Sequence, residues 1–234
     1  MLRTKEAIIL AGGLGTRLKN VISDIPKPMA PVANQPFLLY IFKYLKQQGI
    51  ERIILSVGYK FEVIDSYFGT NFDGIELVYS IENEPLGTGG GIRLAVEKLK
   101  SDTAFIINGD TFFDVDLEAQ ESLAIKSNCN LCLALKPMRN FDRYGSVELK
   151  NSSVISFKEK TFIEKGLING GVYWLQKSLL NIFNYGDKFS FEKDIMEKEV
   201  NNGHIRGYIS DSYFIDIGIP EDYKQANQDF LTFE

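Results

Sequence analysis

Residues 10–18 read Leu10-Ala11-Gly12-Gly13-Leu14-Gly15-Thr16-Arg17-Leu18 and directly follow an apolar run, Ala7–Leu10, that predicts a β-strand. Glycines lack a Cβ atom, so the backbone N–H groups of such a loop can close on phosphate oxygens. Thr16 adds a hydroxyl donor and Arg17 a planar guanidinium suited to phosphate. This segment predicts a phosphate-binding loop at the carboxyl end of a strand.

Two better-known phosphate loops are excluded by the residues present. A Walker A loop requires Gly-Lys-Ser/Thr, which is absent here. A dinucleotide fingerprint requires a third glycine where Leu18 stands and an acidic residue near Ala33. An NAD-linked Rossmann oxidoreductase is therefore disfavoured.

The order of elements around this loop indicates the fold class. Continuous apolar strands alternate with helix-period segments, which is typical of a mostly parallel sheet covered on both faces. The expected strands are Ala7–Leu10, Arg52–Val57, Glu76–Ser80 and Ala104–Ile107, and the expected helices are Phe37–Gln48, Glu62–Phe68 and Gly91–Leu99. After Leu135 we expect a small antiparallel addition of strands at Ser146–Leu149, Val154–Phe157 and Leu167–Leu175, then helices near Lys177–Phe183 and Phe191–Val200 and strands near Ile205–Ile209 and Tyr213–Ile215. We expect residues 1–234 to form one α/β domain that closes with a helix opened by Pro220.

Composition narrows the class of protein further. A net charge of −5 argues against a general nucleic-acid binder. No apolar run approaches the roughly 18 residues of a membrane span, and no signal peptide is evident. Cys129 and Cys132 are the only cysteines and Leu131–Leu135 predicts a strand, so we expect their side chains to point to opposite faces, without a disulfide or metal. A reducing cytoplasm is the expected compartment.

Three further segments carry candidate binding residues. Pro26-Lys27-Pro28 restricts the reach of Lys27, because prolines on both sides fix the backbone. Glu84-Pro85-Leu86-Gly87-Thr88-Gly89-Gly90-Gly91 opens a helix whose first N–H groups suit nucleotide groups. Phe157-Lys158-Glu159-Lys160 reads as a solvated edge by itself, but Glu159 can accept sugar hydroxyls and Lys160 can neutralise a sugar phosphate.

Two strand-end aspartates suggest a metal site. Asp110 follows the strand Ala104–Ile107 within Asn108-Gly109-Asp110, and Asp216 lies in Phe214-Ile215-Asp216-Ile217-Gly218. Ligands of open α/β sheets bind at the carboxyl ends of strands, and paired carboxylates form a hard-oxygen site suited to Mg²⁺. The neighbouring Asp116 is expected to cap a helix, and Asp114 to be solvated.

Taken in order, these motifs resemble the sugar-phosphate nucleotidyltransferase family. The resemblance covers Ala7 to about Gln228 and rests on the Gly-Gly-x-Gly-Thr-Arg, Pro-Lys-Pro, Glu-Pro-Leu-Gly-Thr-Gly-Gly, Asn-Gly-Asp, Glu-Lys and Asp-Ile-Gly segments. It implies a Rossmann-like nucleotidyltransferase fold, a bound nucleoside triphosphate, Mg²⁺ and an α-D-sugar 1-phosphate. The implied reaction is in-line attack by a sugar-phosphate oxygen on the α-phosphorus.

The family motifs assign roles to residues of this chain. The resemblance implies Arg17, Lys27, Asp110 and Lys160 as catalytic residues and Asp110 and Asp216 as metal ligands. The implied nucleotide-binding residues are Leu10, Ala11, Gly12, Gly13, Gly15, Thr16, Glu82, Glu84, Gly87 and Thr88, and the implied sugar-phosphate residues are Gly145, Glu159, Lys160 and Asn169.

The identity of the nucleotide base and that of the sugar are predicted from separate observations. Guanine presents adjacent N–H donors that a carboxylate accepts together, and Glu82 and Glu84 flank a motif without glutamine, which favours GTP. The Glu-Pro-Leu-Gly-Thr-Gly-Gly segment resembles the guanylyl-transferring branch of the family. Within that branch, the short form with Gly-Thr-Gly-Gly-Gly resembles the enzymes that use D-glycero-α-D-manno-heptose 1-phosphate to make GDP-heptose for surface polysaccharide. The alternatives are mannose 1-phosphate as the sugar, a uridylyl- or thymidylyl-transferring relative, and an inactive nucleotide-sugar-binding regulatory subunit. The sequence leaves oligomeric state open, a homo-oligomer included.

Overall fold

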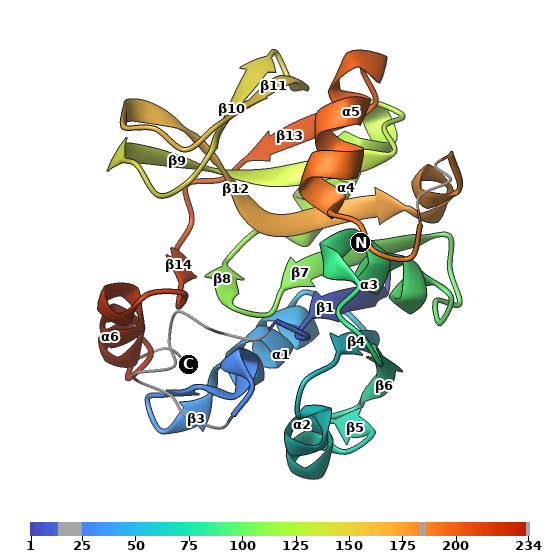
Figure 1. Ribbon diagram of the computed structural model, residues 1–234, viewed down its shortest axis with the longest axis vertical. Helices are drawn as coiled ribbons and strands as arrows, with labels where there is room; N and C mark the ends of the chain where they lie inside the picture. Colours follow the sequence, from blue (N-terminus) through green and yellow to red (C-terminus); the bar gives the residue numbers. More distant parts are fainter. Residues whose placement is uncertain (14–24, 183–185, 233–234) are drawn as a thin grey trace.

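The computed structural model of the protein describes residues 1–13, 25–182 and 186–232. Ten of the described strands form one sheet in the order β10-β11-β13-β9-β12-β7-β1-β4-β6-β5 (Figure 1). The α/β class expected from the sequence is confirmed. No described helix combines the length and the apolar composition that a membrane span requires.

The parallel part of the sheet surrounds the first strand. The strands β7 (Thr103–Asn108), β1 (Glu6–Leu10), β4 (Arg52–Val57) and β6 (Ile75–Ile81) run parallel to one another. Successive residues of β1 point to opposite faces, so Ile8 and Ile9 enter separate apolar clusters and are both fully buried. Burial on both faces explains why the central strands β1, β4 and β7 are largely apolar, whereas β6 near the edge is only partly buried.

Helices cover both faces of this parallel part. The helices α1 (Phe37–Gln47) and α2 (Phe61–Phe68) contribute buried residues to the cluster that contains Ile9. Helix α3 (Gly87–Val96) contributes Ile92 and Val96 to the cluster that contains Ile8. The side chain of Asp116 accepts a hydrogen bond from the Ala119 backbone at 2.9 Å, so it caps α4 (Leu117–Lys126) as expected.

The antiparallel part is larger than the sequence indicated, because two long strands extend the same sheet. Strand β12 (Ile163–Gln176) runs antiparallel to both β7 and β9 (Leu131–Phe141). The strands β10 (Ser146–Lys150) and β11 (Ser153–Lys158) lie beyond them, and β13 (Ile205–Ile209) runs parallel to β9. In Figure 1 this part lies above the parallel strands.

The remaining elements are short, apart from the last helix. The 3-10 turn η2 (Lys27–Met29) precedes β2 (Pro31–Val32) and β3 (Gln35–Pro36), and β5 (Asn71–Phe72) ends the sheet. The strand β8 (Thr111–Phe113) pairs with β14 (Phe214–Asp216), and α6 (Pro220–Asp229) follows. The helix expected at Phe191–Val200 begins as a π-helix, η4 (Phe191–Met196), and continues through α5 (Glu197–Glu199) and the 3-10 turn η5 (Val200–Asn202). The segment expected as a helix from Lys177 forms a 3-10 helix, η3 (Lys177–Ile182).

The expected arrangement of the two cysteines is wrong. Cys129 precedes β9, so strand alternation does not apply to it, and both free thiols are buried in the same apolar cluster. A hydrogen bond between the two thiols, which outweighs burial, lowers the pKa of Cys129 to about 7. The same hydrogen bond, together with burial, raises the pKa of Cys132.

Candidate functional site

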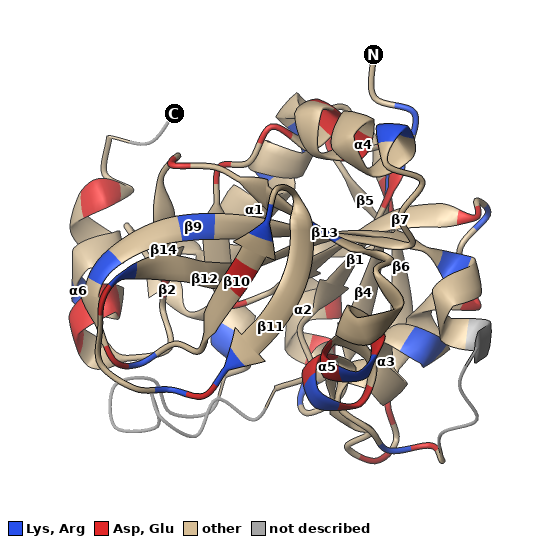
Figure 2. Ribbon diagram, turned by 90° about the horizontal axis from the view of Figure 1, so that it is seen from above, with Lys and Arg blue, Asp and Glu red and all other residues tan. Residues whose placement is uncertain are grey.

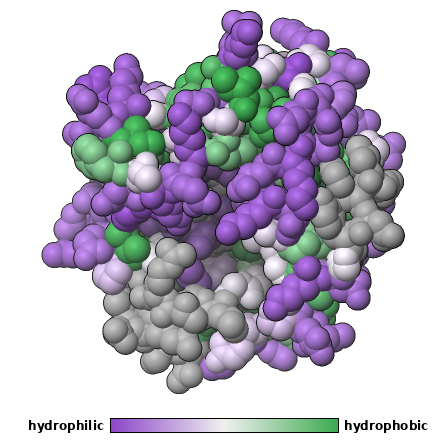
Figure 3. All heavy atoms as spheres, turned by 45° about the horizontal axis from the view of Figure 1, so that its top comes forward, coloured by the Kyte–Doolittle hydropathy of each residue, from purple (hydrophilic) through white to green (hydrophobic). Residues whose placement is uncertain are grey.

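A cavity of about 800 Å³ opens at the carboxyl ends of the parallel strands. Its walls include the last residue of β1, Leu10, followed by Ala11, Gly12 and Gly13. Other lining residues lie at or just after the ends of β4 and β7 or come from α3 and η4, among them Ser56, Asn108, Asp110, Gly87 and Glu192. Figure 3 shows a hollow near the middle of one face, with hydrophilic side chains around it. Positive and negative side chains are mixed over the elements visible in Figure 2.

The described part of the glycine loop is held against its neighbouring strands. The Ala11 N–H donates to the Ser56 carbonyl at 2.8 Å, and the Gly109 N–H donates to the Leu10 carbonyl at 2.9 Å. A Cβ atom on Gly109 would stand 2.6 Å from that carbonyl oxygen, so only glycine permits this approach. Asp110 is thereby held close to the loop. Gly15, Thr16 and Arg17, which we expected to contact phosphate, lie outside the described residues.

The structure brings the two strand-end aspartates to one lysine. The Lys27 Nζ lies 2.6 Å from Asp110 Oδ2 and 3.8 Å from Asp216 Oδ1. The two segments also meet through their backbones, because the Ile217 N–H donates to the Asp110 carbonyl at 3.0 Å. The expected convergence of Asp110 and Asp216 is therefore present in the fold, and the structure adds Lys27 to the pair.

The electrostatics of this cluster favour a cation. Burial raises the pKa of Asp216, the charge of Asp110 raises it further, and Lys27 acts in the opposite direction. Two carboxylates on one side of a cavity repel each other until a positive charge lies between them. The Gly218 N–H donates to Asp216 Oδ1 at 2.7 Å and fixes that oxygen toward the cluster.

The cluster also fits the ligand preference of Mg²⁺. Its donors are carboxylate oxygens from two segments beside a glycine-lined cavity. Mg²⁺ is commonly held by one or two carboxylates and completes its coordination with water and substrate phosphates. Among the described residues, no group of three or more His, Cys, Asp or Glu side chains lies close enough together to hold a metal ion.

The second glycine segment, residues 87–91, packs closely against other parts of the chain and also borders the cavity. Gly87 and Thr88 line the cavity. A Cβ atom on Gly90 would stand 2.4 Å from the Asp187 carbonyl oxygen, and the Gly89 N–H donates to the Phe189 carbonyl at 3.0 Å. The density of glycines therefore has a packing cause that the sequence did not reveal.

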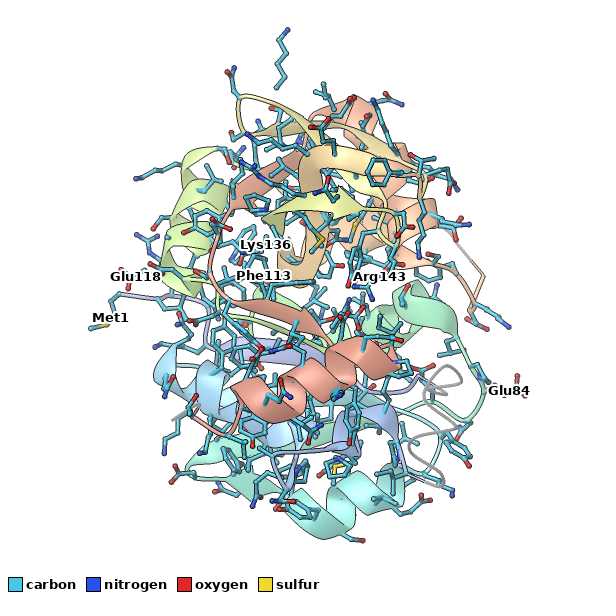
Figure 4. The ribbon with its side chains drawn as sticks, turned by 90° about the vertical axis from the view of Figure 1, so that its left-hand side faces the viewer. Met1, Glu84, Phe113, Glu118, Lys136 and Arg143 are labelled. Carbon is cyan, nitrogen blue, oxygen red and sulfur yellow. The ribbon has the colours of Figure 1, made fainter. Side chains whose placement is uncertain are left out.

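The two glutamates proposed to read the base have different surroundings. The Glu82 carboxylate is half-buried and accepts hydrogen bonds from the Ser56 hydroxyl at 3.2 Å and the Leu86 N–H at 3.0 Å. Its Oε1 lies 3.3 Å from the position that a Cβ atom on Gly12 would occupy. Glu84 is exposed at the rim of the cavity, and its side chain extends away from the body in Figure 4.

The predicted sugar-phosphate residues gather at one end of the antiparallel strands. A Cβ atom on Gly145 would stand 2.6 Å from the Lys158 carbonyl oxygen, directly before Glu159 and Lys160. Ser146 follows Gly145 and begins β10. It pairs with Lys158 on β11 and with Ile168 on β12, and Ile168 directly precedes Asn169. Glu159 and Lys160 are exposed and do not line the cavity described above.

Glu192 in the cavity wall and Tyr173 beside it were missed by the sequence analysis. Glu192 lines the cavity, and its Oε2 accepts hydrogen bonds from Thr88 at 2.7 Å and Ser190 at 2.9 Å. In the sequence it looked like an ordinary charge at the start of a helix. Tyr173 is fully buried beside it, and its hydroxyl accepts a hydrogen bond from Asn169 at 2.9 Å. Only the fold brings these residues together.

The chain is similar to known proteins over nearly its full length. Residues 6–232 match the nucleotidyl transferase family model. The chain is 54% identical over 228 residues to D-glycero-alpha-D-manno-heptose 1-phosphate guanylyltransferase from Aneurinibacillus thermoaerophilus, covering 97% of this chain and 99% of that relative. An enzyme of the same name from Campylobacter jejuni is 54% identical over 220 residues, covering 93% of this chain and 96% of the relative.

A solved structure has the same overall fold. The crystal structure of HddC from Yersinia pseudotuberculosis complexed with GMP-PN superimposes with a TM-score of 0.85 at 40% identity, covering 97% of this chain and all of that one. The family match spans almost the whole chain and includes every segment that forms the cavity and the Lys27 cluster. The chain therefore belongs to the nucleotidyl transferase family.

Proposed function

We propose that this protein transfers GMP from GTP to D-glycero-α-D-manno-heptose 1-phosphate, forming GDP-heptose and pyrophosphate. The observation that carries the proposal is the approach of Asp110 and Asp216 to Lys27 at the edge of a glycine-lined cavity. The two relatives at 54% identity carry the name of this activity over nearly their full length. The buried free thiols suit a reducing compartment, so the proposal places the reaction in the cytoplasm.

In the proposed reaction, an oxygen of the sugar phosphate attacks the α-phosphorus of GTP in line. A new bond joins that oxygen to the α-phosphorus, and the bond to the oxygen bridging the β-phosphate breaks. Pyrophosphate leaves with the bonding electron pair. The attacking phosphate is already anionic, so no protein nucleophile or base is needed, and the side chains act by positioning and by neutralising charge.

Each group has a distinct part in this proposal. The backbone from Leu10 to Gly13, with Gly15, Thr16 and Arg17, cradles the triphosphate. Lys27 leaves its ion pair with Asp110 to meet the α-phosphate when substrate arrives. When bound between the two aspartates, Mg²⁺ would neutralise charge on the phosphate oxygens and orient them.

The antiparallel strands supply the sugar side of the proposed site. Lys160 neutralises the phosphate of the sugar, and Glu159, Asn169 and the Gly145 backbone meet its hydroxyls. Of the two candidate base readers, Glu82 is the better placed because its half-buried carboxylate lies beside Gly12, whereas Glu84 extends outward. A carboxylate at that position accepts the adjacent N–H donors of guanine.

The test is a substrate grid. The protein is incubated with Mg²⁺, with GTP, UTP, dTTP or ATP, and with heptose, mannose or glucose 1-phosphate, and pyrophosphate release is followed. We expect the highest kcat/KM for GTP with D-glycero-α-D-manno-heptose 1-phosphate. Turnover with UTP or dTTP but not GTP would contradict the base assignment. Binding of nucleotide sugars without pyrophosphate release under any condition would instead identify a regulatory subunit.

A further inference from the structure

The turn between β9 and β10 contacts the segment that carries Asp216. Arg143 in this turn lies with its Nη2 2.8 Å from Asp222 Oδ2, and Asp222 belongs to the first turn of α6. Figure 4 shows Arg143 where the antiparallel part of the molecule meets α6. The ion pair thus joins two segments that are far apart in the sequence and approach the site from different sides.

A ring contact reinforces the same junction. The Arg143 guanidinium lies 5.4 Å from the centre of the Tyr144 ring, and Tyr144 meets Phe214 edge to face at 6.2 Å between ring centres. Phe214 begins β14, which ends at Asp216. Burial would lower the pKa of Arg143, but the hydrogen bond to Asp222 and the charges around it outweigh burial and raise it.

The other end of the turn leads to the sugar side of the proposed site. Gly145 follows Tyr144 and packs against the Lys158 carbonyl, next to Glu159 and Lys160. Any displacement of the turn therefore moves the groups proposed to bind sugar phosphate relative to Asp216. In Figure 2 the end of β9 bends toward α6, which shows how directly the turn approaches that helix.

We propose that Arg143 is a positioning residue, whose ion pair with Asp222 fixes the sugar-phosphate side of the site relative to Asp216. The inference rests on the proposed function. It differs from a role in binding phosphate directly, because a positioning role depends on Asp222 as much as on Arg143. The reacting oxygen and the α-phosphorus must be held in line, and small displacements of one partner reduce the rate strongly.

The experiment is a double-mutant cycle with matched controls. Arg143→Ala, Asp222→Asn and the double variant are assayed with GTP and heptose 1-phosphate, with KM measured for each substrate. Arg139→Ala removes an exposed arginine from β9, the strand before the turn, and Glu221→Gln removes a charge from the same helical turn as Asp222. Arg143→Lys tests whether the charge alone suffices.

We expect both single variants to lower kcat/KM for the sugar phosphate by about tenfold, with the KM for GTP nearly unchanged. The double variant should be no worse than either single one, because both remove the same contact. Arg143→Lys should recover part of the loss, and both controls should behave as the unmodified protein.

Three outcomes would overturn the inference. Loss in Arg143→Ala with normal kinetics in Asp222→Asn would mean that Arg143 contacts phosphate directly. Lower thermal midpoints with unchanged kinetics in both variants would mean a purely structural ion pair, and fully additive losses would mean independent roles. If the unmodified protein does not turn over these substrates, the proposed function is wrong. Normal turnover in the unmodified protein and in both single variants would instead overturn only the positioning role of Arg143.

Discussion

At the scale of single residues, the Lys27 ammonium contacts the carboxylates of Asp110 and Asp216 at the edge of the cavity. It is mostly buried, with 14% of its side chain exposed, so solvent screens its ion pairs only weakly. Pro26 and Pro28 on either side restrict its backbone, as the sequence indicated. A cation placed in this way can pass from a carboxylate to a phosphate without a large rearrangement.

Replacing Lys27 by methionine should therefore remove activity while preserving the fold. We expect kcat to fall by roughly 10²–10³-fold, the usual cost of losing one preorganised electrostatic contact. Pyrophosphate release and thermal unfolding are the measurements. Lys46→Met, which removes an exposed ion pair with Asp73, is the control. Activity of Lys27→Met within a few-fold of the unmodified protein would contradict the role.

Glu6 gives a second prediction at this scale, for stability in acid. Burial alone would raise the pKa of Glu6, but hydrogen bonds from Ser101, the Lys100 N–H and Arg52 outweigh burial and lower it. A lowered pKa means that the ionised form stabilises the fold above the ordinary glutamate pKa. This contribution disappears as the pH falls through the lowered value.

Glu6→Gln should thus lower the free energy of unfolding at pH 7 by roughly 1.5–3 kcal/mol, the range for hydrogen bonds to charged groups. The difference in the free energy of unfolding between Glu6→Gln and the unmodified protein should shrink toward acidic pH. Urea unfolding at several pH values measures it. Glu118→Gln, which removes an exposed contact with the N-terminus, should have little effect. A difference that persists unchanged in acid would show that ionisation of Glu6 is not its cause.

At the scale of elements, replacing a glycine of α3 by alanine should lower the stability of the protein, which is the opposite of the usual effect of alanine in a helix. Inside a helix, alanine is normally favoured over glycine by about 1 kcal/mol. At Gly90, however, a Cβ atom would stand 2.4 Å from the Asp187 carbonyl oxygen. Gly90→Ala should therefore destabilise the protein by about 1–3 kcal/mol through overpacking, measured by urea unfolding.

Gly186, which precedes Asp187 in the sequence, provides the control for this prediction. A Cβ atom on Gly186 would meet no atom within 4 Å. Gly186→Ala should leave stability within about 0.5 kcal/mol of the unmodified protein. Stabilisation by Gly90→Ala would mean that the segment around Asp187 moves away at little cost.

The elements that could be predicted are those whose pattern is local. The apolar stripe of α1 and the continuous runs of β1 and β4 are fixed by burial on known faces, and their predicted bounds agree closely with the fold. The length of β12 could not be predicted, because it depends on pairing with a distant segment. The meeting of the two thiols was missed because Cys129 lies before the start of β9. The π-helix at Phe191 likewise has no distinct sequence period.

At the scale of the whole molecule, one sheet carries both halves of the candidate site. The parallel strands present the glycine loop and Asp110, and the antiparallel strands present Gly145 and Asn169. Asp110 and Asp216 could be paired from the sequence, since both stand at strand ends beside family motifs. Arg143 and Asp222 could not, because nothing local marks a contact between a β-turn and a distant helix.

We propose that Asp110 and Asp216 together hold one divalent cation beside the triphosphate. Titration with Mn²⁺, followed by electron paramagnetic resonance in the presence of a non-hydrolysable GTP analogue, measures this directly. We predict one tight site in the unmodified protein, weakened at least about tenfold in both Asp110→Asn and Asp216→Asn, the expected cost of losing a charged ligand. Asp114→Asn, an exposed neighbour, should bind normally. Unchanged Mn²⁺ affinity in either aspartate variant would contradict the claim.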